Sequence, residues 1–194
     1  MKEKMLVTGG TGFIGYHILK KLKGKFSIIS LSSKKPITKR KIKNIKYLKC
    51  DISNKKSLFD KLSKIKKIDY VINLAGYVDH SNKKKTFETH YYGCKNLVDY
   101  LSYKKIKLFI QIGSSLEYGN QKSPHHEKLK CNPIGVYGKS KLRSTKYILK
   151  AAKKKKLPYV ILRLYQIYGP NQSINRLIPI VIDSCLKNKK FKCS

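Results

Sequence analysis

The stretch Met5-Leu6-Val7-Thr8-Gly9-Gly10-Thr11-Gly12-Phe13-Ile14-Gly15 decides the fold of this chain. An apolar run comes first, glycines at positions 9, 12 and 15 follow, and apolar residues then recur at helical spacing (Ile14, Ile18, Leu19, Leu22). This order predicts a buried strand, a glycine-rich turn and a helix that ends near Gly24.

The three spaced glycines suit the binding of a dinucleotide. Gly9 permits the tight turn, Gly12 lets backbone N–H groups approach a pyrophosphate, and Gly15 lets the helix pack closely on the sheet. The N-terminus of the helix also favours a bound anion. We therefore expect a dinucleotide site here, the alternative being an ordinary tight turn between a strand and a helix.

Further along the chain, short apolar runs alternate with amphipathic segments. The pattern predicts strands at 5–7, 26–31, 47–48, 69–74, 108–112 and 159–164, and helices at 54–66, 86–103 and 136–152. Nearly continuous apolar strands that alternate with helices are typical of a parallel sheet covered on both faces. We expect an α/β fold with a doubly wound, Rossmann-type sheet of strand order 3-2-1-4-5-6.

The length of 194 residues suits one ordinary domain. No apolar run reaches the roughly 18–20 residues that a membrane span needs. The N-terminus also lacks the apolar stretch of a signal peptide. These features predict a soluble, cytoplasmic protein without a membrane partner.

The cysteines and histidines do not predict a metal site. The cysteine count is odd, and no two have the spacing of a zinc ribbon (Cys50, Cys94, Cys131, Cys185, Cys193). The run His125-His126-Glu127 is consecutive in a loop, where neighbouring residues seldom bind one ion. We expect reduced thiols and no bound metal.

The charge is strongly positive, with 45 Lys and Arg against 10 Asp and Glu and a net charge of +35. Such a balance raises the hypothesis of nucleic-acid binding. However, arginine, whose fork suits phosphates and base edges, occurs only at positions 40, 143, 163 and 176. The lysines are spread along the whole chain, so we expect a solvated surface, salt-sensitive binding to polyanions and no specific nucleic-acid partner.

Tyr137 and Lys141 form a candidate acid–base pair. They are four residues apart on an expected helix and therefore share a face. The tyrosine pKa of about 10 is high for catalysis at neutral pH, and a nearby ammonium would lower it. The pair could then move a proton at a hydroxyl or carbonyl oxygen while a hydride moves at carbon. The alternative is a surface pair that arose by chance.

Ser114 stands in the stretch Gly113-Ser114-Ser115-Leu116-Glu117-Tyr118-Gly119, directly after the fifth expected strand. In a parallel sheet this places the serines at the carboxyl edge, where ligands bind. A hydroxyl there could donate to a reacting oxygen. The alternative is a simple Ser/Gly turn.

Taken together, these motifs give the chain a family resemblance. It resembles the extended short-chain dehydrogenase/reductases, the NAD-dependent epimerase/dehydratases that act mainly on nucleotide sugars. The resemblance extends from the glycine-rich turn to Arg163-Leu-Tyr-Gln-Ile-Tyr-Gly-Pro170, through Cys50-Asp51-Ile52, Asn73-Leu-Ala-Gly76, the Ser114 stretch and Tyr137-Gly-Lys-Ser-Lys141.

The resemblance implies roles for particular residues. Ser114 would be the catalytic serine, Tyr137 the acid/base, and Lys141 the lysine that activates the tyrosine and binds the ribose. The other cofactor contacts would be Gly9, Gly12, Phe13, Ile14 and Gly15 at the pyrophosphate, Asp51 and Ile52 at the adenine, Leu74, Ala75 and Gly76 near a ribose, and Tyr165 near the nicotinamide.

Two departures from the family pattern bear on the reaction. Members that prefer NAD carry an acid at the end of the second strand, where this chain has Ser32, Ser33 and Lys34. These residues could receive a 2′-phosphate, which favours NADP over NAD. Sugar 4,6-dehydratases carry an acidic pair after the catalytic threonine, where this chain has Ser115 and Leu116, so we do not expect dehydratase activity.

The chain is also short for the family, whose members commonly have about 300 residues. We expect an NAD(P)-binding domain at 1–170 and the start of a truncated substrate domain at 171–194. The expected function is that of a nucleotide-sugar epimerase or 4-keto reductase, with a nucleotide-sugar substrate and a possible homodimer. The alternatives are a dinucleotide-binding module without turnover and a basic nucleic-acid-binding protein.

Overall fold

The computed structural model describes residues 2–79 and 81–191, so Cys193 lies outside the described residues. The chain divides into two compact units, Met1–Leu164 and Tyr165–Ser194. The second unit contains the helix α6 (Leu177–Leu186), in which Lys187 and Asp183 form an ion pair at the C-terminal end. The sheet and the candidate catalytic side chains belong to the first unit.

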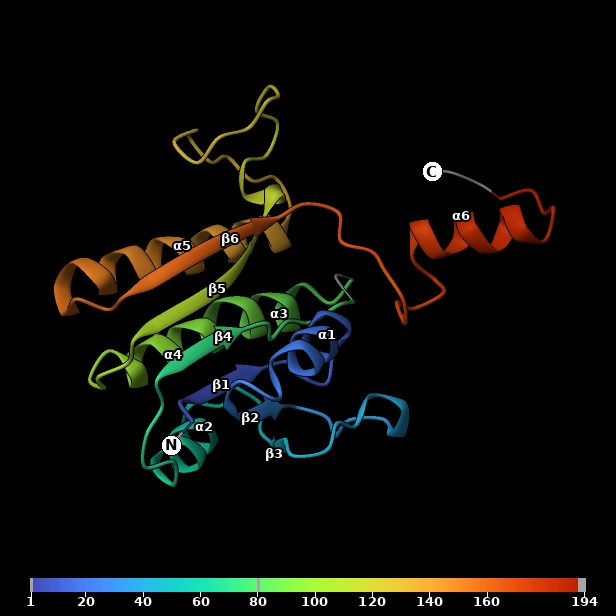
Figure 1. Ribbon diagram of the computed structural model, residues 1–194. Helices are drawn as coiled ribbons and strands as arrows, with labels where there is room; N and C mark the ends of the chain where they lie inside the picture. The colour runs from blue at the N-terminus through green and yellow to red at the C-terminus, as the bar shows by residue number, and fades with distance from the viewer. Residues whose placement is uncertain (1, 80, 192–194) are drawn as a thin grey trace. The chain divides into compact units, whose positions relative to one another are not determined.

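The first unit is built on a six-stranded sheet of order β3-β2-β1-β4-β5-β6 (Figure 1). Every neighbouring pair of strands is parallel. The expected strand order is confirmed. The strands are β1 (Lys4–Thr8), β2 (Ser27–Ser32), β3 (Lys46–Lys49), β4 (Tyr70–Asn73), β5 (Leu108–Ser114) and β6 (Tyr159–Leu164).

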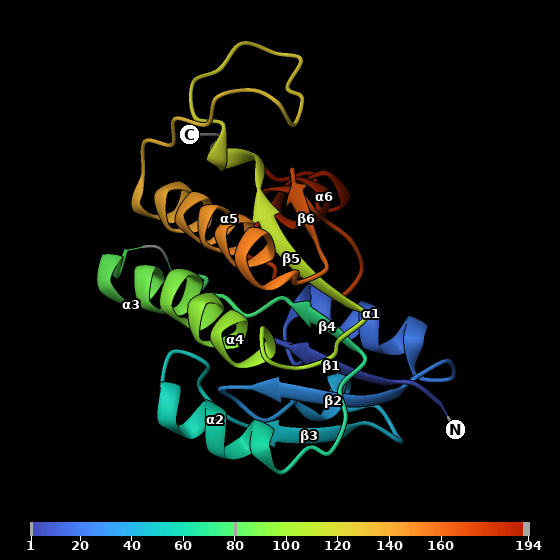
Figure 2. The same ribbon diagram turned by 90° about the vertical axis from the view of Figure 1, so that its left-hand side faces the viewer.

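Helices cover both faces of this sheet, as expected. Figure 2 shows α2, α4 and α5 on one face and α1 on the other. The α-helices of the first unit are α1 (Phe13–Leu22), α2 (Lys55–Ser63), α3 (Lys83–Phe87), α4 (Gly93–Leu101) and α5 (Val136–Lys155). Three short turns are η1 (Thr38–Arg40), η2 (Glu88–Tyr92) and η3 (Ser115–Glu117), of which η2 is a π-helical turn.

Two hydrophobic clusters fill the space between the sheet and the helices. Side chains alternate along a strand, so Leu6 of β1 belongs to one cluster while Met5 and Val7 belong to the other. The larger cluster lies under α2, α4 and α5, and the smaller one receives Leu19 from α1. Burial on both faces explains why central strands such as β1 are nearly continuously apolar, whereas the edge strand β6 leaves Val160 and Leu162 exposed.

The sheet differs from the expected one at its carboxyl edge. Strand β5 continues to Ser114 and β2 to Ser32, so both serines lie at strand ends and not in the loops that follow. The helix expected at 86–103 begins earlier and contains the π turn η2 between α3 and α4. Such turns are frequent at functional sites.

The strand β3 forms one edge of the sheet and is short. Its sequence is Lys46-Tyr47-Leu48-Lys49, and both lysines are exposed. Among the described residues, none of the helices has the length and apolar character needed to cross a bilayer.

Two adjacent positions on α5 test the packing. Ile148 is fully buried in the larger cluster, whereas Leu149 is 44% exposed. We expect Ile148→Ala to lower the free energy of unfolding by about 2–5 kcal/mol, because it leaves a cavity. Leu149→Ala should change it by about 0.5 kcal/mol or less. Urea unfolding measures both, and equal losses would contradict the described packing.

Candidate active site

The glycine-rich turn has the shape that a phosphate-binding loop requires. Gly9 has φ +70°, and a Cβ there would lie 2.7 Å from the carbonyl carbon and oxygen of Leu74, so only glycine fits. The N–H of Gly12 donates to the Gly9 carbonyl at 3.0 Å, which closes the turn. A Cβ on Gly15 would lie 2.6 Å from the Cα of Gly10, so α1 starts in direct contact with the turn.

The N-terminus of α1 is available to an anion. Gly12 is the N-cap, and no side chain of the described residues caps the helix there. A Cβ on Gly12 would meet only the Gly9 oxygen, at 3.2 Å, so the space in front of the turn is open. Phe13 and Ile14 form the first turn of the helix and are half-buried. The backbone therefore fits a pyrophosphate group.

The end of β2 lies beside this turn. Ser32 is buried, and its hydroxyl accepts a hydrogen bond from the N–H of Thr11 at 3.4 Å. Ser33 and Lys34 follow and are exposed. The expected cofactor contacts of this stretch thus fall next to the glycine-rich turn, and no acid stands among them.

Asp51 and Ile52 lie in the loop after β3. The Asp51 side chain is exposed and accepts hydrogen bonds from the N–H and hydroxyl of Ser53, at 2.9 and 2.7 Å. Ile52 is buried against Gly93, whose Cβ would lie 2.6 Å from Ile52 Cγ1. The buried amide of Asn96 donates to the Ile52 carbonyl at 3.0 Å and so fixes the loop from α4, a contact that sequence reasoning missed.

Leu74, Ala75 and Gly76 leave the sheet at the end of β4. The Leu74 N–H donates to the Thr8 carbonyl at 3.1 Å. Gly76 lies against the ring of His90, since a Cβ on Gly76 would be 2.5 Å from His90 Cε1. These residues stand directly beside Gly9, so the structure brings the two expected parts of the cofactor site together.

A row of buried polar side chains crosses the sheet beneath these loops. Thr8, Asn73 and Gln111 are direct neighbours on β1, β4 and β5. The Thr8 hydroxyl donates to Asn73 Oδ1 at 2.5 Å, and Asn73 Nδ2 donates to Gln111 Oε1 at 2.7 Å. The thiol of Cys94 also donates to Gln111 Oε1, at 3.2 Å. Burial raises the pKa of this thiol to about 12, so it remains protonated.

The catalytic candidates meet at the end of this row. Ser114 ends β5, and Tyr137 and Lys141 lie on the face of α5 that packs against it. Lys141 is buried, and its Nζ donates to the Ile112 carbonyl at 2.7 Å. That Nζ lies 5.7 Å from the centre of the Tyr137 ring. A side-chain hydrogen bond links Ser114 and Tyr137.

The electrostatics differ from the expectation that Lys141 lowers the pKa of Tyr137. Burial raises the pKa of Tyr137; a hydrogen bond with Ser114 opposes the rise, and the charge of Glu117 adds to it. Burial lowers the pKa of Lys141 to about 8, against raising contributions from Cys94 and Glu117. The expected direction for Tyr137 was wrong because burial disfavours both charged forms, and a sequence does not display burial.

His90, in the π turn η2, forms one wall of the site. Its ring packs edge-on against Tyr137, with centroids 4.9 Å apart. The backbone N–H of Tyr77 donates to His90 Nε2 at 3.3 Å. The Ser144 hydroxyl donates to the backbone carbonyl of His90 at 2.8 Å. The sequence alone indicated no role for His90.

Tyr165 is the expected site residue that the first unit does not contain. It begins the second unit and is 59% exposed. Within residues 2–79 and 81–191, no three His, Cys, Asp or Glu side chains gather as they would around a metal ion.

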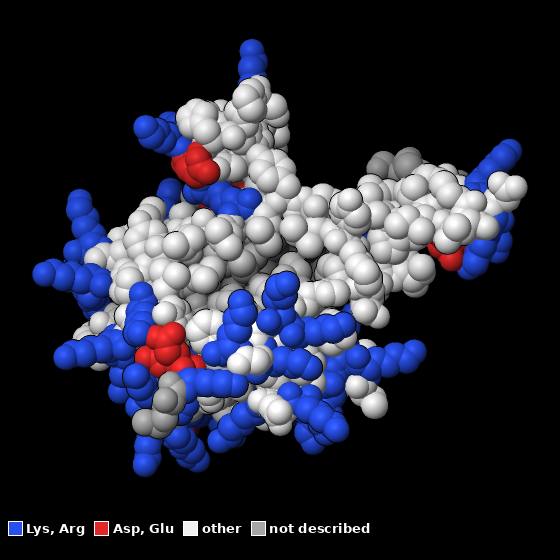
Figure 3. Space-filling model, viewed as in Figure 1, with Lys and Arg blue, Asp and Glu red and all other residues white. Residues whose placement is uncertain are grey.

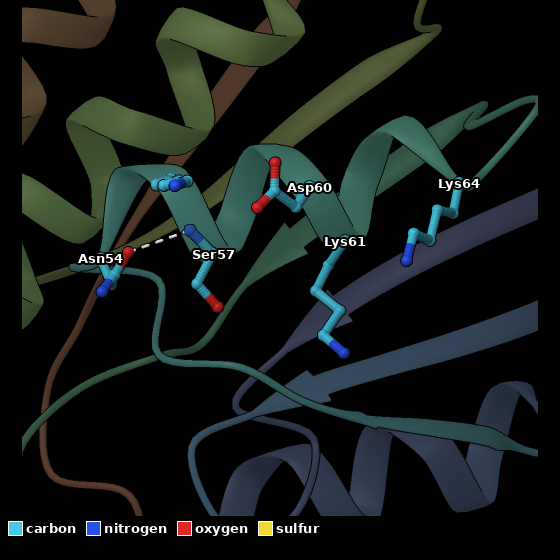
Figure 4. Close-up of a pocket in the computed structure, with 6 residues that line it drawn as sticks. Asn54, Ser57, Asp60, Lys61 and Lys64 are labelled. Carbon is cyan, nitrogen blue, oxygen red and sulfur yellow. Dashed lines mark hydrogen bonds between the residues drawn. The ribbon is translucent and has the colours of Figure 1, made fainter.

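Two surface features lie apart from these side chains. A hollow on α2 is lined only by residues of that helix and its two caps, which makes it an open helix face (Figure 4; Asn54, Lys56, Ser57, Asp60, Lys61, Lys64). Basic side chains cover the region of α1, β2 and β3 densely in Figure 3, with few acids among them. Both features agree with a solvated, lysine-rich surface.

Comparison with known proteins assigns the chain to a family. Residues 5–194 match the sequence profile of the NAD dependent epimerase/dehydratase family. The chain is 33% identical to the dTDP-D-glucose 4,6-dehydratase of Dictyostelium discoideum over 216 residues, which cover 97% of this chain and 49% of that protein. The chain belongs to the NAD dependent epimerase/dehydratase family.

Solved structures agree with this assignment. A UDP-glucuronic acid 4-epimerase from Bacillus cereus in complex with NAD is 26% identical, with a TM-score of 0.82, over 96% of this chain and 63% of that one. A UDP-N-acetylglucosamine 4-epimerase from Methanobrevibacter ruminantium M1, in complex with UDP-N-acetylmuramic acid, is 25% identical, with a TM-score of 0.87, over 97% and 64%. The chain thus spans about half to two thirds of the length of these relatives.

The lowered pKa of Lys141 predicts a pH-dependent stability. Between about pH 8 and its ordinary value of 10.5, the unfolded state binds one more proton than the folded state, so the contribution of Lys141 to stability rises with pH. The unfolding free energy of the parent minus that of Lys141→Met should rise across this window, by at most about 1.4 kcal/mol per pH unit.

Urea unfolding at several pH values measures this difference. Lys139→Met, at an exposed position of the same helix, is the control, and the difference should rise more steeply with pH for Lys141→Met than for Lys139→Met. Equal pH dependence of the two differences would show that burial does not destabilise the Lys141 ammonium.

Proposed function

We propose that the chain binds a nicotinamide dinucleotide and acts on a nucleotide sugar as an epimerase or a 4-keto reductase. The observation that carries the proposal is the meeting of Ser114, Tyr137 and Lys141 beside the glycine-rich turn. Family membership and the NAD-bound relative from Bacillus cereus support it.

The cofactor, when bound, would supply a carbon that takes or gives a hydride. Gly9, Gly12 and Gly15, with Phe13 and Ile14, would hold its pyrophosphate, while Asp51, Ile52, Leu74, Ala75 and Gly76 would line the adenosine side and Tyr165 the nicotinamide. Ser32, Ser33 and Lys34 present hydroxyls and a cation where a 2′-phosphate would stand, which favours NADP.

The proton chemistry would belong to Tyr137. Its raised pKa keeps the phenol protonated at neutral pH, so it is set to donate a proton to a sugar carbonyl oxygen. Ser114, hydrogen-bonded to Tyr137, would hold that oxygen. Lys141 would bind the ribose and, with a pKa of about 8, could exchange a proton near neutral pH. Ser115 and Leu116 offer no acid or base for eliminating water, so we propose no dehydratase step, although a dehydratase is among the relatives.

A second candidate is dinucleotide binding without turnover. The glycine-rich turn alone can hold a pyrophosphate, whereas turnover also needs contacts to the sugar nucleotide that strengthen in the transition state. Nucleic-acid binding is a third candidate and rests on the net charge of +35.

Cofactor binding is tested by titration with NADPH and NADH at moderate salt, followed by nicotinamide fluorescence. We expect saturable binding that is tighter for NADPH. Gly12→Asp should weaken it at least about tenfold, because a carboxylate would enter the pyrophosphate cradle. Gly24→Asp is the matched control, since its Cβ would meet nothing within 4 Å at the other end of α1. A folded parent that binds neither form, or equal losses in both variants, would contradict the proposed site.

Turnover is tested with a panel of nucleoside diphosphate sugars. Tyr137→Phe should lower kcat by about 10²–10⁴-fold while cofactor affinity is kept, because the proton donor is lost. Tyr103→Phe, at a position 78% exposed, is the control. Unchanged turnover in Tyr137→Phe would refute the assigned role. A parent that binds cofactor and turns over no sugar would support the second candidate.

A further inference from the structure

Glu117 is a fully buried carboxylate that the proposed chemistry does not use. It ends the short turn η3, directly after β5, and none of its surface is exposed. Burying a carboxylate is costly unless other groups compensate its charge and satisfy its hydrogen bonds. The contacts of the Glu117 side chain must therefore offset the cost of burying its charge.

Both carboxylate oxygens have specific partners. Oε1 accepts a hydrogen bond from the backbone N–H of Ser114 at 2.9 Å. Oε2 accepts from the Thr145 hydroxyl at 2.8 Å and from Arg163 Nε at 3.2 Å. The Arg163 side chain is only 16% exposed, so the ion pair is shielded from solvent.

The surrounding backbone leaves room for this carboxylate. A Cβ on Gly113 would lie 2.5 Å from Glu117 Oε1, so glycine is required there for the side chain to fold back. Gly113 is also the strand neighbour of Arg163 across β5 and β6, which brings the guanidinium to the same place. The position of the charge pair thus follows from the sheet itself.

The partners of Glu117 belong to two separate parts of the catalytic group. Ser114 is at the end of β5. Thr145 lies on α5 at a spacing of four from Lys141 and eight from Tyr137, so all three share one helix face. The carboxylate therefore joins the strand that carries the serine to the helix face that carries the tyrosine and the lysine.

We propose that Glu117 is a positioning residue that holds Ser114 in register with the Tyr137–Lys141 face of α5. Arg163 makes its buried charge tolerable. The inference rests on the proposed function for its catalytic meaning, although the geometry can be tested without turnover. A residue that only stabilised the fold would leave the ionisation of Tyr137 unchanged when one of its contacts was removed and its charge was kept.

The charge of Glu117 acts on the groups that face it from the loop, α5 and β6. It raises the pKa of Tyr137, after the larger effect of burial. It raises the pKa of Lys141, against the lowering by burial. Burial also raises the pKa of Cys131, where Arg163 and Glu117 act in opposite directions. Arg163 is the cation that faces the carboxylate directly.

The first experiment is a pH titration of the protein labelled with ¹³C at tyrosine Cζ. Tyr137→Phe identifies the resonance of Tyr137. In Thr145→Val, which keeps the charge of Glu117, we expect Tyr137 to ionise at higher pH than in the parent, because the helix face moves away from Ser114, which opposes the rise in the Tyr137 pKa. Leu149→Ala, at an exposed position of the same helix, is the control, and Tyr137 should ionise in it as in the parent. An unchanged Tyr137 titration in a folded Thr145→Val would overturn the proposal.

The second experiment measures turnover in the same variant, which keeps the charge and lacks one contact. Thr145→Val should lower kcat about 10²-fold with little change in KM or cofactor affinity, because the helix face moves relative to Ser114. Thr145→Ser should restore turnover. Turnover in Thr145→Val equal to that of the parent would overturn the proposal. If the parent turns over no sugar, the proposed function fails, and the Tyr137 titration alone decides the role of Glu117.

Discussion

A row of buried hydrogen bonds joins the ends of β1 and β4 to the middle of β5. Thr8, Asn73 and Gln111 satisfy one another across β1, β4 and β5, where an apolar core would leave their polar atoms without partners. The glycine-rich turn and the loop after β4 leave the sheet directly above this row. Gln111 donates to the Ile112 carbonyl, which also receives Lys141, so the row continues into the catalytic group. The loops that we propose to bind the cofactor and the helix that carries Tyr137 and Lys141 therefore contact the same row of hydrogen bonds.

Burial governs the chemistry of this group more strongly than the charges nearby. Tyr137 and Lys141 are both shifted toward their neutral forms, the tyrosine upward and the lysine to about 8. A substrate oxygen would thus meet a protonated phenol beside a lysine that exchanges protons near neutral pH. The same enclosure explains why a carboxylate such as Glu117 is found only with a guanidinium and two further donors around it.

The sequence predicted the parts of the molecule that local patterns determine. Apolar runs and their alternation with helices sufficed to predict the six strands and their order. Gly9 sufficed to predict the tight turn, where its φ is positive. Contacts between distant residues were not accessible in this way. The pair of Glu117 and Arg163 joins residues 46 positions apart, and Asn96 reaches a loop 44 positions away. The π turn around His90 and the raised pKa of Tyr137 likewise depend on packing that no local pattern displays.

The short edge strand β3 has a consequence for the behaviour of the protein in concentrated solution. An open sheet edge offers unpaired backbone groups to the strand of any other molecule, which is a common route to aggregation. Here the edge has only four residues, and exposed Lys46 and Lys49 bracket its two less polar ones. A second molecule approaching with its own β3 would bring like charges together at both ends of the pairing. Lys46 and Lys49 thus oppose the pairing of this edge of the sheet with a strand of another molecule.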